Sequence, residues 1–310
     1  MTIRTFKSSD SGVPTLNNAA GSLNNVLRHC LGTSGWAEAF VSGAVSAWRA
    51  PAGSRQYLRV DDTQTFAGAA CYAYLRGFRE MSDINTGTAA FPRVDQLALG
   101  VAVQRTNGST VTGPRPWICV VGQTGFYFWY EHDSVTAGAF VGTGATHGML
   151  YFGDVVSERD GQTLSNCLLA ARSASTVESF GLHSSVLGRY MSAHPLTEQP
   201  LSTAVQFWAL GISATATDAM GANANTGATD PITARVPLSP VQIYHDGSSG
   251  VGRNLVGQMP GLFAVHCSPV RFDTFSLEGG GRTFLVLPVR NSANNSQGRV
   301  VIETTSTQTW

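Results

Sequence analysis

Four acidic residues near the first predicted strands have types and spacing that could support chemistry. Asp61 and Asp62 are adjacent, and Glu80 and Asp83 follow in a polar stretch further along the chain. Two carboxylates across a sugar linkage can hydrolyse it, and loop carboxylates suit Ca²⁺. Adjacent aspartates at a strand end more often form turns or cap other segments. We therefore predict no catalytic, cofactor-binding or metal-binding residues; a glycan hydrolase and a Ca²⁺ site at Asp61, Asp62 and Asp83 are the alternatives.

The other chemical motifs are incomplete. None of the seven histidines stands in an HExxH pattern, and residues 247–250 (GSSG) lack the spacing of a nucleophile elbow. Residues 131–133 (EHD) place a histidine between two carboxylates, but strand neighbours point to opposite faces, so a strand-end turn is expected. The glycine-rich residues 141–144 and 279–282 precede no helix that could hold a phosphate, and both indicate turns.

Five consecutive aromatic residues occupy positions 126–130 (FYFWY). A strand with this sequence carries rings on both faces, whereas a carbohydrate platform would use one face. We predict a central strand buried on both sides, or on one side with a neighbouring subunit on the other.

One helix is expected, over residues 19–31. Leu23, Val26, Leu27 and Cys30 recur at the spacing of one helical face, and Gly32 is the predicted C-terminal cap. Thr5 and Phe6 suggest a short strand before it.

After the helix the hydrophobic period changes to two, which indicates β-strands. Polar, turn-forming segments separate them, and residues 213–230 read as a long exposed loop. Pro288 predicts an edge strand or a bulge. Strands are expected at 57–61, 69–78, 117–121, 125–130, 148–152, 167–171, 205–212, 242–245, 262–265, 283–290 and 298–303. The predicted fold is mainly β: sandwich-like antiparallel sheets with one short N-terminal helix and long loops.

The composition favours a protein covered by neighbours. Charged residues are 13% of the chain, about half the usual share, and the formal net charge is zero. Neutral polar groups are less costly to bury than charges. All but one of the basic residues are Arg, which suits interfaces, although a GC-rich gene would give the same bias. No basic surplus indicates nucleic acid.

The cysteines and the N-terminal residues indicate which cellular compartment to expect for this protein. The five cysteines are widely spaced, without a CxxC or a Cys/His cluster, which favours buried thiols in a reducing cytoplasm. Residues 1–12 show no signal peptide, and no apolar run reaches the ~18 residues of a membrane span. The cysteines are Cys30, Cys71, Cys119, Cys167 and Cys267.

Several segments, in order along nearly the whole chain, resemble a family of tailed-bacteriophage virion structural proteins. They are AGSLNNVLRHCL followed by GW, QYLRVDDT, LRGFREMSDINTGTAAFP, PRPWICVVGQTGFYFWY, LYFGDVVSERDGQT, MPGLFAVHCSPV and GRTFLVLPV. Two departures are the short segment 32–35 and the pair Arg28-His29, where the family has a longer loop and an acidic-apolar pair. The resemblance implies a virion component and no catalytic residues.

The sequence thus predicts a non-enzymatic virion protein of the neck, collar or tail, assembled in the host cytoplasm. It would form a ring-like homo-oligomer and contact other phage proteins, with no cofactor, nucleic acid or membrane. A head decoration, tail fibre or carbohydrate-binding receptor module is the alternative. Two β domains are expected, residues 1–175 with the helix and 176–310, although one continuous domain would also fit.

Overall fold

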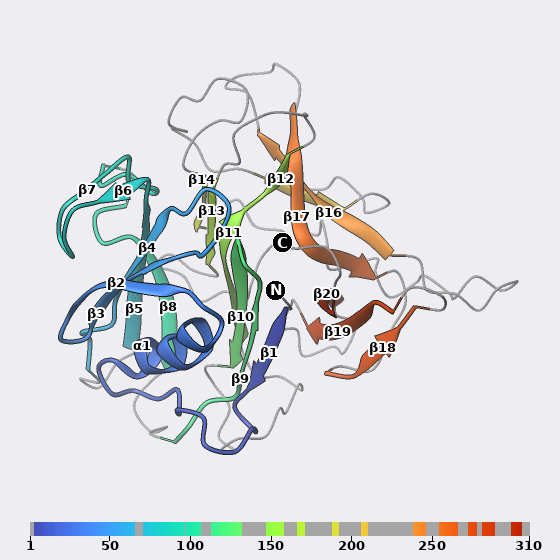
Figure 1. Cartoon of the computed structure of the whole chain (residues 1–310), viewed down its shortest axis with the longest axis horizontal. Helices are drawn as coiled ribbons and strands as arrows, with labels where there is room; N and C mark the ends of the chain where they lie inside the picture. The colour runs from blue at the N-terminus through green and yellow to red at the C-terminus, as the bar shows by residue number, and fades with distance from the viewer. Residues whose placement is uncertain are drawn as a thin grey trace, which may run out of the picture.

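Segments with alternating, β-branched and aromatic residues form strands along the chain, and within the part that the structure describes only one short segment is helical (Figure 1). Every strand pair among the described residues is antiparallel, which confirms the predicted fold class. The computed structural model describes residues 3–65, 71–95, 97–106, 113–131, 147–157, 166–170, 188–191, 206–209, 238–245, 254–265, 272–277, 281–288 and 299–305.

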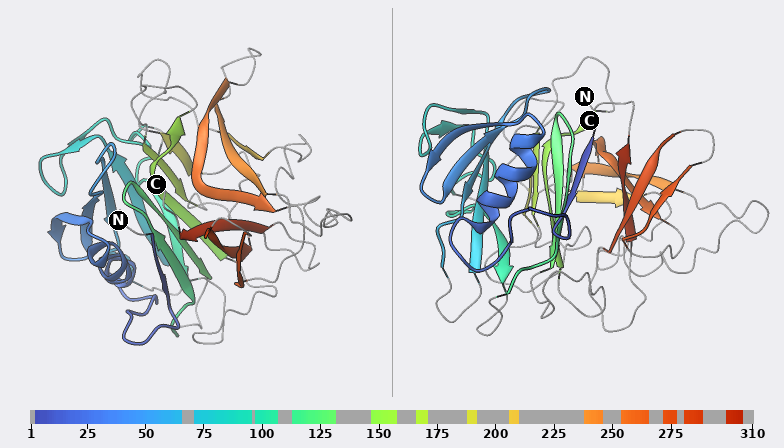
Figure 2. Two further views of the ribbon diagram at one scale, coloured as in Figure 1. Left: turned by 45° about the vertical axis from the view of Figure 1, so that its right-hand side comes forward. Right: turned by 60° about the horizontal axis from the view of Figure 1, so that its bottom comes forward.

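Three sheets lie in layers, with the central sheet between an N-terminal and a C-terminal sheet (Figures 1 and 2). The central sheet has the order β1-β9-β10-β11-β13-β14. Its strands are β1 (Arg4–Lys7), β9 (Trp117–Val121), β10 (Gly125–Glu131), β11 (His147–Asp154), β13 (Asn166–Ala170) and β14 (Gly188–Met191).

The aromatic segment 126–130 lies in β10, inside the central sheet, and is buried along its whole length. Phe126, Phe128 and Tyr130 face the core shared with the N-terminal sheet. Tyr127 and Trp129 face the core shared with the C-terminal sheet. The prediction of a central strand buried on both sides is therefore confirmed, because each face of β10 supplies rings to a different core.

The N-terminal sheet has the order β2-β3-β4-β5-β8. Its inner face packs on the central sheet together with the helix, and its outer face carries the β6–β7 hairpin over a small cluster around Tyr57, Phe78 and Met81. The strands are β2 (Ala37–Ser42), β3 (Val45–Arg49), β4 (Tyr57–Asp61), β5 (Cys71–Phe78) and β8 (Val101–Thr106); the hairpin is β6 (Glu80–Met81) and β7 (Gly87–Thr88).

The predicted helix is present as α1 (Ser22–Leu27), which continues into a π-helical turn, η1 (Arg28–Gly32). The expected face of Leu23, Val26, Leu27 and Cys30 is fully buried between the two sheets. The predicted position of the C-terminal helix cap, Gly32, was wrong. Gly35, not Gly32, adopts the left-handed conformation with φ 85°, where the Trp36 N–H bonds to the Leu31 carbonyl at 3.0 Å.

The C-terminal sheet has the order β15-β16-β17-β20-β19-β18, and β12 pairs with β17. Pro288 is the last residue of β19, which lies between β18 and β20, so β19 as a whole is not the predicted edge strand. The alternative, a bulge, fits a register shift in β19, but this shift lies between Thr283 and Phe284, at the other end of the strand from Pro288. At a strand end its missing N–H leaves the ladder intact. The strands are β12 (Val156–Ser157), β15 (Gln206–Ala209), β16 (Leu238–His245), β17 (Asn254–Val265), β18 (Thr274–Ser276), β19 (Thr283–Pro288) and β20 (Arg299–Thr305).

Every strand predicted from the sequence overlaps a strand of the structure, and Thr5 and Phe6 lie in β1. Strands β2, β3 and β8 and the short β6, β7, β12, β14 and β18 were not predicted. The loop 213–230 lies outside the described residues. The division at about residue 175 stays a prediction; β14, beyond it, pairs with β13, before it.

Candidate functional site

The adjacent aspartates at the end of β4 have separate roles, because neighbouring positions in an extended chain point to opposite sides. Asp61 lies on the outer side, 3.2 Å from the Arg59 guanidinium, and accepts a hydrogen bond from the Thr63 hydroxyl at 2.7 Å. Asp62 points inward and is fully buried. The two carboxylates therefore do not share a substrate or an ion.

Asp62 caps the helix from a distant part of the chain. Its Oδ2 accepts the N–H groups of Leu23 at 2.8 Å and Asn24 at 3.2 Å, at the first turn of α1. Gly21, at the N-cap position, has no side chain to do this. A carboxylate is also favoured beside the positive end of the helix dipole. Asp62 is thus the capping group that adjacent aspartates were expected to supply.

Arg105 on β8 completes this buried assembly, which we call the Asp62–Arg105 lock. Its Nε lies 2.8 Å from Asp62 Oδ1, with both side chains fully buried. Its terminal nitrogens donate to the carbonyls of Asn17, Ala19 and Gln64. One guanidinium therefore joins β8, the segment before α1, and the chain after β4.

Burial has the largest effect on the pKa of Asp62 in the Asp62–Arg105 lock. Loss of water raises the pKa of Asp62 from its ordinary 3.8 to about 6, even though Arg105 and the amides of Asn24 and Leu23 lower it. The folded protein therefore holds this proton more tightly than the unfolded chain.

This shift predicts a pH-dependent stability with a defined sign. The contribution of Asp62 is fully present below about pH 4 and is lost as the pH rises through about 6. The difference in free energy of unfolding between the wild type and Asp62→Asn should change by on the order of 3 kcal/mol between about pH 4 and pH 7. Urea denaturation across this range measures it; parallel pH profiles for the two proteins would contradict the assignment.

A further buried carboxylate, Asp154 at the end of β11, holds a turn of the N-terminal sheet. It accepts hydrogen bonds from the Ser54 N–H at 2.8 Å and from the Ser54 hydroxyl. Burial raises its pKa, while the bonds from Ser54 lower it. Gly53 has φ 71°, and a Cβ there would overlap the Asp154 carboxylate. This carboxylate also serves to join chain segments.

The remaining predicted candidates have local roles or lie outside the described residues. Asp83 accepts the N–H groups of Asn85 and Thr86 in the β6–β7 turn, and these bonds lower its pKa. Glu80 is exposed on β6. No group of three or more His, Cys, Asp or Glu side chains is arranged to hold a metal in the described part of the chain.

Where the structure describes the other motifs, their residues also have structural roles. Glu131 is the buried last residue of β10, whereas residues 132–133 and 141–144 lie outside the described residues. Gly281 makes a left-handed turn, and Arg282 beside it bonds to Glu303 at 2.8 and 2.7 Å. Cys30, Cys71 and Cys119 are buried thiols, as predicted.

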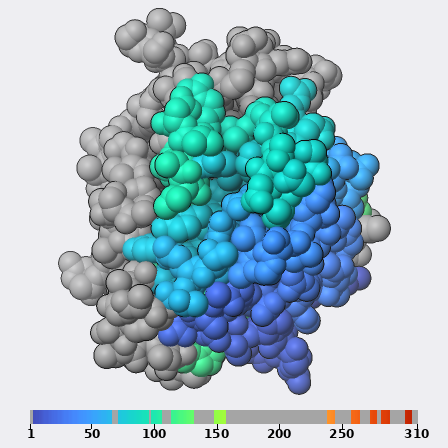
Figure 3. All heavy atoms as spheres, turned by 90° about the vertical axis from the view of Figure 1, so that its left-hand side faces the viewer, coloured from blue at the N-terminus to red at the C-terminus, as the bar shows by residue number. Residues whose placement is uncertain are grey.

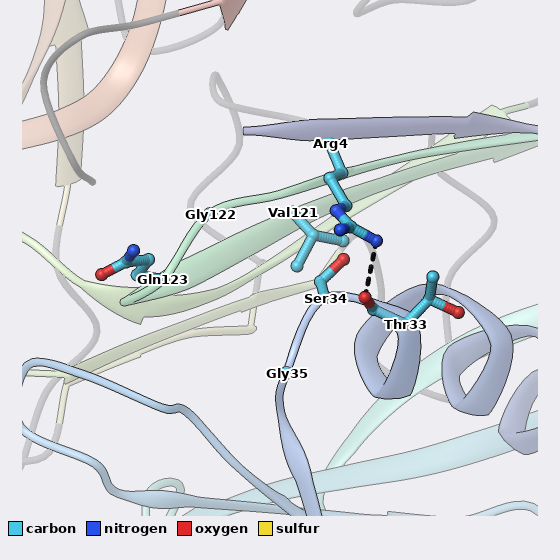
Figure 4. Close-up of a pocket in the computed structure, with 7 residues that line it drawn as sticks. All are labelled: Arg4, Thr33, Ser34, Gly35, Val121, Gly122 and Gln123. Atoms are coloured by element: carbon cyan, nitrogen blue, oxygen red, sulfur yellow. Dashed lines mark hydrogen bonds between the residues drawn. The ribbon is translucent and has the colours of Figure 1, made fainter. Parts of the chain in front are cut away.

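One hollow of about 300 Å³ lies beside the end of the helix (Figure 4). Arg4, on β1, reaches across it and donates from Nη1 to the Thr33 carbonyl at 2.7 Å. The Ser34 hydroxyl donates to the Cys30 carbonyl at 2.7 Å. An arginine is favourable at the negative end of a helix. The polar side chains here hold the helix terminus in place.

The outer face of the N-terminal sheet carries arginine and tyrosine side chains; Figure 3 shows the molecule from the side on which this sheet lies. Arg59 on β4 and Arg76 on β5 are directly opposite each other, and Tyr72 and Tyr74 alternate with Arg76 along β5. All four side chains are partly exposed. We call this set the Arg/Tyr face. Sequence reasoning missed it, although alternating Tyr-Ala-Tyr-Leu-Arg in a predicted strand was a usable signal.

No family model and no curated protein matches this sequence. Within the described residues, no helix is long and apolar enough to cross a membrane. The resemblance to phage virion proteins therefore stays a prediction.

Proposed function

We propose that this protein is a structural subunit of a bacteriophage virion, in the neck, collar or tail. It would be assembled in the host cytoplasm and act by binding copies of itself and adjacent virion proteins. One observation carries the proposal: the buried ionisable groups connect segments of the chain. Asp62 and Arg105 lock the helix to two strands, and Asp154 holds the Ser54 turn. Side chains used in this way stabilise a scaffold.

The surface of the described sheets suits assembly. Tyr and Arg are enriched at protein interfaces, and the Arg/Tyr face presents both from a rigid sheet. The strand β2 is at the edge of this sheet, pairs only with β3 among the described strands, and exposes Val41. An edge strand can extend by pairing with another chain. A ring of identical subunits repeats one such contact around an axis.

The structure removes one basis for the alternative of a carbohydrate-binding module. That reading used the aromatic segment 126–130 as a sugar platform. All five rings are buried in the two cores, so none of them is available to stack on a sugar. A head decoration or tail fibre that binds through other residues is an outcome that the experiment below distinguishes.

The test is the composition and structure of purified phage particles. We expect mass spectrometry to find this protein in many copies per particle, and cryo-electron microscopy to place it in a ring at the neck or tail. Density on the head surface or in a fibre would support the alternative instead. Absence from mature particles, together with turnover of a substrate by the purified protein, would overturn the proposal.

A further inference from the structure

Two buried thiols are neighbours at the point where the helix meets the central sheet. Cys30 lies in the π-helical turn η1, and Cys119 lies in β9. Both side chains are fully buried in the core between the N-terminal and central sheets, and both are free cysteines. Burial, and next the interaction with the neighbouring Cys30 thiol, raise the pKa of the Cys119 thiol well above its ordinary value. We call these two residues the Cys30–Cys119 pair.

Contacts on both sides of the pair hold η1 against β9. Phe6 on β1 is the register partner of Cys119, and its ring makes an edge contact at 5.5 Å with His29, which precedes the other thiol in the chain. Val121, two residues beyond Cys119 in β9, lines the hollow at the helix end together with Thr33 (Figure 4). The turn is therefore fixed over this part of β9 by contacts that do not involve the thiols.

Neighbouring thiols can be joined by an external disulfide of low molecular weight, R–S–S–R. One protein thiol loses its proton and attacks a sulfur of the oxidant, which forms a mixed disulfide and releases one R–S⁻. The second protein thiol then loses its proton, attacks the protein sulfur of the mixed disulfide and releases the other R–S⁻. The protein loses two electrons and two protons, and the oxidant takes them up as two R–SH.

The location of the pair determines when this reaction can start. Only the thiolate attacks a disulfide, and burial in the closed core disfavours the thiolate of Cys119. Reaction therefore requires η1 to open, and its end is held by the hydrogen bond from Arg4 to the Thr33 carbonyl at 2.7 Å. Single π-helical turns are rare and occur frequently at functional sites. Opening one such segment costs less free energy than unfolding the whole chain.

We infer that the Cys30–Cys119 pair is a redox latch: it stays as two thiols in a reducing compartment and, when η1 opens in the presence of a low-molecular-weight disulfide, forms one disulfide that joins the helix to β9. The bond closes about 90 residues of chain into a loop, which stabilises the fold by restricting the unfolded chain. Disulfides are rare in the cytoplasm and persist outside the cell. On the proposed function, on which this use of the latch rests, the bond forms after particles leave the host.

The first test uses the full chain with Cys71→Ala, Cys167→Ala and Cys267→Ala, which leaves only the pair. The matched control also carries Cys30→Ala, so that Cys119 is alone. Each protein is incubated with dithiodipyridine, an aromatic disulfide, then digested without reduction and analysed by mass spectrometry. We expect the pair to lose two hydrogen atoms, with the peptides of Cys30 and Cys119 linked, whereas the control gives at most a mixed disulfide.

Thermal unfolding measures the effect of the bond on stability. Oxidation should raise the midpoint of unfolding of the pair-only protein by about 5–10 °C, and dithiothreitol should reverse the rise. The control should unfold at the same temperature before and after treatment. A scan before oxidation shows whether the Ala substitutions leave the chain folded. Peptide mapping of the treated wild type gives the same answer without any substitution, because the link between Cys30 and Cys119 is identified directly.

A further variant of the pair-only protein tests the route of access. Arg4→Ala removes the hydrogen bond to the Thr33 carbonyl, so η1 should open more often and the disulfide should form about fivefold faster. Arg93→Ala is the control, because it removes an arginine from an exposed ion pair with Asp95, and it should leave the rate unchanged. Equal rates in the two variants would show that η1 does not control access and would overturn the inference.

The outcomes separate this inference from the proposed function. Thiols that stay reduced in the folded chain, or that each carry a separate adduct, would overturn the inference and leave the virion proposal standing. In released particles we expect the linked peptide, and in subunits taken from the host cytoplasm we expect free thiols. Free thiols in released particles would overturn the latch. Absence of the protein from particles would overturn the virion proposal, while a disulfide in the purified chain would still support the latch.

Discussion

Replacing Arg105 with alanine should lower the free energy of unfolding by about 3–5 kcal/mol, because one partner of a buried ion pair is lost while the other stays buried. The variant loses the contact with Asp62 and the hydrogen bonds to the carbonyls of Asn17, Ala19 and Gln64. Asp62 is then left beside the helix without its counter-charge. Urea denaturation followed by circular dichroism measures the change.

Arg93→Ala is the control for this prediction. Arg93 pairs with Asp95 at 2.8 Å on the surface, with 43% and 67% of the two side chains exposed. Exposed ion pairs contribute about 0–1 kcal/mol. If Arg105→Ala costs no more than Arg93→Ala, the buried pair does not stabilise the fold as we describe.

The sequence predicted those parts of the fold that depend on local pattern. The spacing of Leu23, Val26 and Leu27 identified the buried face of the helix, and the run 126–130 identified a strand buried on both sides. Both inferences need only the period of the element and the character of its side chains. The pairing order of the strands needs contacts between distant segments, which no local pattern contains.

Two local features were missed for physical reasons. The strand β2 has a register shift between Glu38 and Phe40, so its side chains do not alternate regularly, and the period-two signal is lost. The helix continues through a π-helical turn that includes Gly32, and the left-handed glycine that follows the helix is Gly35. A wider turn of this kind cannot be distinguished from an α-helical one by hydrophobic spacing.

The role of Asp62 shows which part of the candidate site could not be predicted from the sequence. The sequence pattern did not distinguish Asp61 from Asp62, and it favoured turn or capping roles for both; Asp62 does cap the helix. The helix that Asp62 caps begins at Ser22, and its basic partner is Arg105. Both are distant along the chain, so only the fold could show that Asp62 is buried and Asp61 is not.

The second large effect is expected from replacing a large buried aromatic residue of β10 with alanine. Trp129→Ala should lower the free energy of unfolding by about 3–5 kcal/mol, the range for large buried aromatic residues. Trp129 is 1% exposed and makes an edge contact with Phe272 at 5.1 Å, in the core shared with the C-terminal sheet. Phe128→Ala, one residue earlier, should cost a similar amount, but it removes a ring from the core shared with the N-terminal sheet.

Comparing these two variants also tests the domain organisation, because β10 contributes to both cores. If the chain unfolds as one unit, both substitutions should move a single calorimetric transition to lower temperature. If residues 1–175 and 176–310 unfold separately, Phe128→Ala should shift one transition, and Trp129→Ala should shift the transition that includes the C-terminal sheet. Since rings from one strand fill the cores on both sides of the central sheet, we expect a single transition. Two transitions that respond separately would show that the core around Trp129 can open while the core around Phe128 stays folded.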